Sequence, residues 1–210
     1  MLVEISGDPA RTHGQRLPAD LVRALREAHT RLEEIDLLAV AAGPGSFTGL
    51  RVGIATVQGL AFARGLNVVP VSTLDALASA SAQDPERPPL IGAWMDAQRG
   101  EVFSTLYGSG VRAVLPASAA TPLDTLAAWR AAIGQEQVLF AGDGALRYRD
   151  VIATALGTQA RFLAPVSALA GIIGRMAART PERAVTPHAL VPLYIRRSDA
   201  ELARDRGHTR

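Results

Sequence analysis

The chain has 210 residues, of which 48% are hydrophobic and 20% are charged, and this composition is typical of a folded globular protein. It contains no cysteine, which excludes disulfides, thiolate zinc sites and cysteine nucleophiles. It contains no lysine either, which excludes P-loop and Schiff-base lysines, and its net charge of +2 does not indicate a nucleic-acid-binding surface.

The first part of the chain is predicted to alternate strands with helices. Apolar residues at three- and four-residue spacing indicate helices, whereas short apolar runs bounded by glycine or proline indicate strands. The expected elements are a strand at 2–5, a helix over 18–32, a strand at 36–41, a helix over 50–63, a strand at 68–71, and a helix over 74–81 capped by Ser72 and Thr73. The strand, helix and strand over 36–71 predict a parallel βαβ unit.

The second part follows a polar, proline-rich linker at residues 83–89. Its expected elements are a hairpin of strands 90–95 and 101–106, a helix over 123–133, a strand at 137–141, a turn at 142–144, and a helix over 167–179 capped by Ser167. The linker divides the chain into an N-terminal α/β lobe at 1–85 and a second α/β lobe at 90–197. A charged, flexible tail is expected at 198–210.

No segment of the chain predicts a membrane location. The N-terminus lacks a basic stretch followed by an apolar one, and no apolar run reaches the roughly 18 residues of a membrane span. We therefore expect a cytoplasmic protein with no membrane contact.

A glycine-rich loop at Gly43–Gly49 connects a predicted strand to a predicted helix. Backbone amides at a helix N-terminus favour anions, so Gly43, Gly45, Ser46 and Thr48 are candidates for binding a phosphate or nucleotide. The loop lacks the Gly-Lys-Ser/Thr ending of a Walker A motif and the flanking glycines of a nucleophile elbow. The preferred alternative is a tight turn in which Ser46 or Thr48 caps the helix.

The helix that follows this loop carries small residues along one face. They are Gly49, Gly53, Thr56, Gly59 and Ala63, at spacings of three and four. Each glycine inside a helix costs roughly 1 kcal/mol relative to alanine, so this face is suited to the close approach of another backbone. Two interpretations stay open: a partner-binding helix, or a helix fully buried in the core.

Other charged and metal-binding candidates carry little information. Asp96, Arg99 and Glu101 surround the predicted hairpin turn, and charges at a turn are usually solvated. The four histidines are scattered and form no His-x-x-x-His or His-Glu-x-x-His pair, so no metal site is predicted.

Several segments resemble the TsaB (YeaZ) family. The most specific is Gly-Pro-Gly-Ser-Phe-Thr-Gly-Leu-Arg-Val-Gly-Ile-Ala-Thr at 43–56, continuing through Gly-Leu-Ala at 59–61. Further matches lie at 13–18, 71–77, 95–102 and 192–196, in the order found in the family, so the resemblance covers nearly the whole chain. It implies an α/β fold of two lobes like those of actin, Hsp70 and sugar kinases.

The resemblance also implies a role as a non-catalytic scaffold or activator. TsaB pairs with the catalytic subunit TsaD, is joined by TsaE, and supports transfer of a threonylcarbamoyl group to N6 of adenosine 37 in tRNAs that read codons beginning with A. It implies that nucleotide and metal belong to partner subunits, that tRNA is contacted through the complex, and that the chain alone forms a homodimer. The helices at 18–32 and 50–63 would bind the partner. The candidate interface residues are Leu21, Leu25, Gly49, Arg51, Gly53, Thr56, Gly59, Leu60 and Ala63.

One departure from the family concerns the N-terminus. Family members have two further strands before the segment that begins here at Met1, so the first lobe is expected to be truncated, most simply through a misassigned start. Two functional alternatives also stay open: an independent kinase-like or peptidase enzyme, and a stand-alone nucleotide-binding homodimer.

Overall fold

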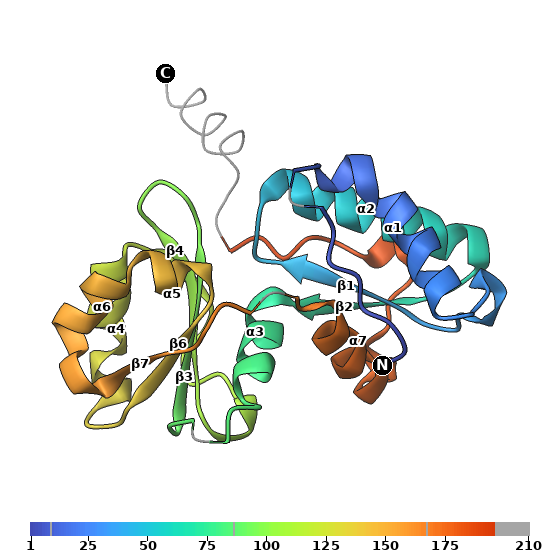
Figure 1. Cartoon of the computed structure of the whole chain (residues 1–210). Helices are drawn as coiled ribbons and strands as arrows, with labels where there is room; N and C mark the ends of the chain where they lie inside the picture. Colours follow the sequence, from blue (N-terminus) through green and yellow to red (C-terminus); the bar gives the residue numbers. More distant parts are fainter. Residues whose placement is uncertain (9, 86, 167, 196–210) are drawn as a thin grey trace.

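Two β-sheets organise the molecule (Figure 1). The computed structural model describes residues 1–195 apart from 9, 86 and 167. The first sheet pairs β1 (Leu38–Gly43) with β2 (Val68–Ser72) in parallel. The second has the strand order β5-β4-β3-β6-β7. Its strands are β3 (Leu90–Asp96), β4 (Val102–Tyr107), β5 (Ser118–Ala120), β6 (Val138–Ala141) and β7 (Ala160–Phe162).

Helices cover both sheets (Figure 1). They are α1 (His13–Glu27), α2 (Phe47–Arg64), α3 (Thr73–Ser81), α4 (Pro122–Ile133), α5 (Asp143–Arg147), α6 (Arg149–Leu156) and α7 (Ala170–Arg179). Short 3-10 turns are η1 (Leu32–Glu34), η2 (Ser109–Val111), η3 (Gly157–Gln159), η4 (Pro181–Arg183) and η5 (Pro187–Ala189). Ile54 and Ala61 of α2 pack on Leu38 and Val40 of β1, so α2 covers one face of the first sheet.

The helix α3 lies between the two sheets. Its Leu74, Leu77 and Ala78 join the core of the second sheet, while Ala76 packs with Val69 of β2. The hydroxyl of Tyr107 on β4 donates a hydrogen bond to Asp75 at 2.6 Å. Residues on both sides of α3 therefore connect the first sheet to the second.

The core of the second sheet is built around three aromatic side chains. Trp94 makes edge-to-face contacts with Trp129 and Phe140, at ring-centroid distances of 5.8 and 5.5 Å. All three are buried. Such aromatic pairs stabilise a core beyond the area that they bury.

Several predicted elements are confirmed. The parallel pair β1 and β2 flanks α2, as expected of the βαβ unit. The β3–β4 hairpin is antiparallel across the predicted turn. Ser72 caps α3, because its hydroxyl accepts a hydrogen bond from the amide of Asp75 at 3.3 Å.

The predictions for the N-terminal residues are partly wrong. Residues 2–5 form no strand: Leu2 is 82% exposed, and Glu4 accepts a hydrogen bond from the amide of Gly171 at 2.6 Å. The first helix begins at His13, because the side chain of Gln15 caps its start by accepting a hydrogen bond from the amide of Thr12 at 3.0 Å. It ends at Glu27. Pro18 consequently lies inside this helix, and Leu32 lies in η1.

Two predictions in the second part also change. Residues 142–144 form no free turn: they begin α5, with Gly142 as the cap at a φ of 106°. A Cβ on Gly142 would collide with the carbonyl oxygen of Trp94, so this position requires glycine. The helix α7, within the range predicted for the second lobe, packs through Ile172 and Ile173 on β2.

Some expectations have no test in the structure. Ser167 and the predicted tail at 198–210 lie outside the described residues. Along the described chain, β1 pairs with β2 on one edge and with no strand on the other. The strands expected before Met1 stay a prediction. None of the described helices is long and apolar enough to cross a membrane.

Candidate functional site

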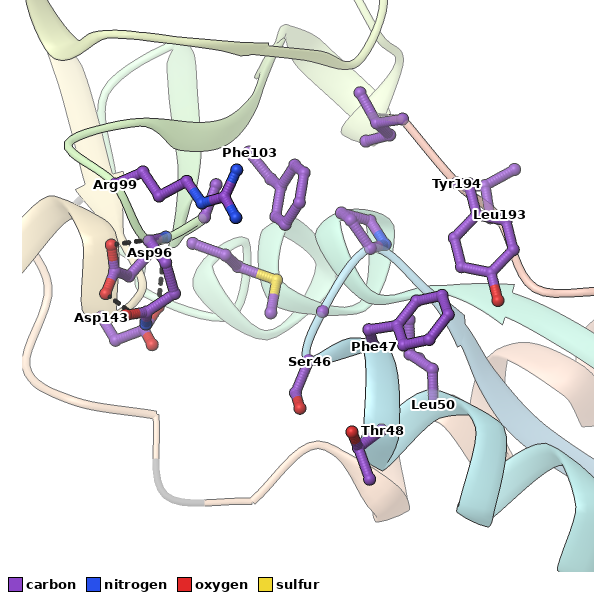
Figure 2. A pocket seen from close by; sticks show the side chains of 16 residues that line it. Ser46, Phe47, Thr48, Leu50, Asp96, Arg99, Phe103, Asp143, Leu193 and Tyr194 are labelled. Atoms are coloured by element: carbon purple, nitrogen blue, oxygen red, sulfur yellow. Dashed lines mark hydrogen bonds between the residues drawn. The ribbon is translucent and has the colours of Figure 1, made fainter. Parts of the chain in front are cut away.

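A cavity of about 700 Å³ lies between the loop that precedes α2 and the turn between β3 and β4 (Figure 2). Residues 193–195 form its third wall. It is lined by Pro44, Gly45, Ser46, Phe47, Thr48, Leu50, Met95, Asp96, Ala97, Gln98, Arg99, Phe103, Asp143, Leu193, Tyr194 and Ile195. The fold thus brings the glycine-rich loop and the charged hairpin turn to one site.

The glycine-rich loop is held from one side by the C-terminal segment. Gly43 has a φ of 122°, and the amide of Leu193 donates to the carbonyl of Ala42 at 2.6 Å. A Cβ on Gly43 would lie 2.6 Å from the carbonyl oxygen of Leu193, so glycine is needed both for the backbone conformation and for this close approach.

Ser46 is the cap of α2. Its hydroxyl accepts a hydrogen bond from the amide of Gly49 at 3.3 Å. The interpretation of this loop as a capped strand-to-helix turn is therefore confirmed. Phosphate or nucleotide binding by Gly43, Gly45, Ser46 and Thr48 stays a prediction.

Hydrogen bonds to two carboxylates, those of Asp96 and Asp143, stabilise the hairpin turn. Asp96 accepts hydrogen bonds from the amide of Gln98 at 3.2 Å, from the side-chain nitrogen of Gln98 at 2.9 Å and from Arg147 at 3.0 Å. Asp143 accepts from the amides of Asp96 and Gly144, at 3.1 and 2.9 Å. These contacts hold Gln98 and Arg99 at positive φ values of 62° and 56°. Both carboxylates thus have structural partners.

The predicted partner face of α2 is open in this structure. A Cβ on Gly53 or Gly59 would meet no atom within 4 Å outside the nearby helix backbone. Phe62, on the same helix, is 69% exposed. The alternative that α2 is fully buried in the core is therefore wrong. Packing among the described residues does not account for these two glycines.

The other predicted interface residues divide by exposure. Arg51, Gly59 and Ala63 are exposed. Leu21 and Leu25 of α1, and Gly49, Gly53, Thr56 and Leu60 of α2, are half-buried. The two helices are neighbours, since a Cβ on Gly14 of α1 would lie 3.8 Å from a methyl group of Val52.

A cluster that the sequence did not predict lies at the mouth of the cavity. The rings of Phe47 and Tyr194 stack at a centroid distance of 5.7 Å (Figure 2). The guanidinium carbon of Arg51 lies 4.2 Å from the centre of the Phe47 ring, and its Nε donates to the Tyr194 hydroxyl at 3.3 Å. Both aromatic residues belong to segments that carry the family resemblance, but no local pattern pairs them.

The segment that supplies Tyr194 is anchored on α2. Gln58 donates hydrogen bonds to the carbonyls of Pro187 and Leu190, at 2.9 and 3.0 Å. Leu190 is buried.

No group of three or more His, Asp or Glu residues suited to a metal ion occurs in the part of the chain that the structure describes.

Comparison with known proteins defines the class. Residues 7–203 match the family model described as TsaD: tRNA N6-adenosine threonylcarbamoyltransferase. The chain is 32% identical over 193 residues to an uncharacterized protein of Mycobacterium tuberculosis, covering 91% of this chain and 79% of that one. It is 30% identical over 203 residues to the tRNA threonylcarbamoyladenosine biosynthesis protein TsaB of Bacillus subtilis, covering 86% of this chain and 81% of the relative.

A solved structure agrees with these relatives. A Pseudomonas aeruginosa protein described as similar to peptidase YeaZ superposes with a TM-score of 0.74 at 29% identity, over 89% of this chain and 85% of that one. The expected actin-like α/β fold class is confirmed. Within the broad TsaD class, the chain belongs to the TsaB (YeaZ) family.

Proposed function

We propose that this chain is a non-catalytic scaffold or activator in the synthesis of threonylcarbamoyladenosine at position 37 of tRNAs that read codons beginning with A. It would act in the cytoplasm by pairing with the catalytic subunit TsaD, with TsaE joining the pair. Nucleotide and metal would be held by the partner subunits, and tRNA would be contacted through the complex. The Bacillus subtilis relative is a tRNA threonylcarbamoyladenosine biosynthesis protein, which supports this pathway.

The open glycine face of α2 carries the proposal. Gly53 and Gly59 lie inside a helix of 18 residues, where each costs roughly 1 kcal/mol relative to alanine. Neither has a neighbour within 4 Å that would explain the absence of a side chain. A helix of a second protein approaching this face would explain both glycines, because small residues allow helix backbones to approach closely.

The cavity supports the scaffold role over independent catalysis. The described residues that line it include no histidine, so none of them supplies a histidine base beside Ser46 or Thr48. Asp143 accepts hydrogen bonds from backbone amides, and Asp96 accepts one from Arg147. Both carboxylates therefore stabilise the turn. An independent kinase-like or peptidase enzyme would need a group free to take or give a proton.

The central experiment is reconstitution with TsaD from the same organism. We expect the wild-type chain to co-purify with TsaD, and the mixture to form threonylcarbamoyladenosine in tRNA once TsaE is added. The variant Gly59→Leu should lose co-purification, because its side chain would fill the space that the partner helix needs.

The matched control is Ala127→Leu, which places the same side chain at an exposed position of α4. It should co-purify normally. A folded Gly59→Leu chain that binds TsaD as tightly as this control would show that the wrong face was assigned. Absence of any wild-type complex would refute the scaffold role.

The alternatives are tested on the isolated chain. The cavity beside the glycine-rich loop is large enough for a small ligand. Micromolar binding of ADP or ATP by a homodimer, without TsaD, would favour the stand-alone nucleotide-binding protein. Turnover of ATP or a peptide by the purified chain would favour an independent enzyme.

A further inference from the structure

Arg51 differs from the arginines of α1 in its partners. Arg16 pairs with Asp20 at 2.8 Å, and Arg23 lies 3.8 Å from Glu27. Among the described residues, the ring and hydrogen-bond partners of Arg51 are Phe47 and Tyr194, which are uncharged. Among the described residues no carboxylate lies within ion-pair distance of it. Its positive charge is therefore not neutralised within the described chain.

The guanidinium of Arg51 is nevertheless held in place. The Phe47 ring lies against it at 4.2 Å, and the Tyr194 hydroxyl accepts its Nε–H at 3.3 Å. These two contacts use one face of the guanidinium and its Nε, and leave both terminal amino groups without a hydrogen-bond partner in the described part of the chain. Two parallel N–H donors in this arrangement match the two oxygens of a carboxylate.

The surroundings of Arg51 resemble the centre of a protein interface. Phe47 is 43% exposed and Tyr194 is 44% exposed, so two aromatic rings and a guanidinium reach solvent together. Arginine and tyrosine are enriched among the residues that dominate binding energy, and fixing a side chain before binding lowers the entropy lost on association. Gly59, which is also exposed, lies eight residues further along α2.

We infer that Arg51 binds an acidic side chain, Asp or Glu, on the catalytic partner, and that Tyr194 is a positioning residue that orients Arg51 for it. This inference rests on the proposed function and adds the chemistry of the contact. A protein carboxylate fits better than a nucleic-acid phosphate, because Arg51 is the one basic side chain in the described cluster of Phe47, Arg51 and Tyr194, whereas phosphate backbones are bound by clusters of basic residues.

The test is the dissociation constant for TsaD, measured by titration calorimetry. Arg51→Ala should weaken binding about ten- to a hundredfold, as expected for loss of a charge-assisted hydrogen-bonded pair. Arg51→Lys should recover only part of this loss, because lysine keeps the charge but not the paired donors. Arg112→Ala, an exposed arginine beyond the second sheet, should bind like wild type.

The role of Tyr194 has a readout that does not need the partner. In the free chain, the Nε proton of Arg51 should exchange slowly with water, as measured by NMR. Tyr194→Phe should speed this exchange while keeping the ring stack, and should weaken TsaD binding severalfold. An unchanged resonance in Tyr194→Phe would overturn the positioning role.

The outcomes separate the two proposals. If wild type binds TsaD and Arg51→Ala binds equally well, the Arg51 inference fails and the scaffold role stands. If wild type does not bind TsaD, both fail. If Arg51→Ala weakens tRNA binding by the isolated chain but leaves TsaD affinity unchanged, the ligand is a phosphate and the inference is overturned.

Discussion

The two sheets of this protein bury their side chains to different extents. Every residue of β4 and β6 is buried, whereas the first four residues of β1 are only half-buried. Several large exposed apolar residues, among them Val22, Phe47 and Phe62, lie on helices of the first sheet, whereas Val114 and Leu123 are the ones beside the second sheet among the described residues. The second sheet has a closed core, while more apolar surface beside the first sheet reaches solvent.

Two aromatic clusters in the described part of the molecule also differ in exposure. Trp94, Trp129 and Phe140 contact one another out of reach of water, so their geometry contributes to folding. Phe47 and Tyr194 stack where both are partly exposed, and both contact the guanidinium group of Arg51. The same residue types stabilise the fold in the second sheet and form the proposed binding surface beside the first.

The largest expected loss of stability comes from a substitution in the buried core of the second sheet. Trp94→Ala should lower the free energy of unfolding by about 3–5 kcal/mol, because it removes a buried ring and leaves a cavity. Ile54→Ala, in the smaller core under α2, should cost about 2 kcal/mol. Urea denaturation followed by circular dichroism measures both. Equal losses in the two variants would contradict the contrast between the sheets.

An intermediate effect concerns the connection between the sheets through Tyr107. Burial raises the pKa of the Tyr107 hydroxyl above its ordinary value, and the hydrogen bond to Asp75 raises it further. The folded state then keeps a proton that the unfolded state releases. Stability should therefore fall as pH rises above about 10, by about 1.4 kcal/mol per pH unit.

The variant Tyr107→Phe tests this dependence, because it cannot release a proton. Unfolding measured between pH 9 and 11 should lose the part of the slope that comes from this residue. Identical slopes in wild type and Tyr107→Phe would show that the buried hydroxyl does not control alkaline stability.

The smallest expected effect has the opposite sign. Gly53→Ala and Gly59→Ala should each raise the free energy of unfolding by roughly 1 kcal/mol, because both glycines lie in a helix and a Cβ there meets no neighbour. Gly142→Ala should instead destabilise, because its φ is 106° and its Cβ would collide with Trp94. Thermal unfolding of the three variants measures this. A loss of stability in Gly59→Ala would mean that this face is already packed.

Sequence reasoning succeeded where the signals are local. The sequence predicted caps at Ser72 and Thr73 and at Ser46 or Thr48, and in the structure the hydroxyls of Ser72 and Ser46 accept from the amide three residues later. It failed at His13, where Pro18 suggested a helix start that the capping by Gln15 moved earlier. It also failed at Gly142, whose neighbour Trp94 comes from another strand.

The sequence by itself determined most helices and strands, the loop at 43–49 and the family, because caps, periodicity and motifs depend on residues close together in the chain. Only the tertiary structure decided that this loop meets the β3–β4 turn around a cavity, and that α7 packs on the first sheet. The Arg51–Tyr194 contact spans 143 residues of sequence. Such contacts arise from the packing of whole elements, which no local pattern specifies.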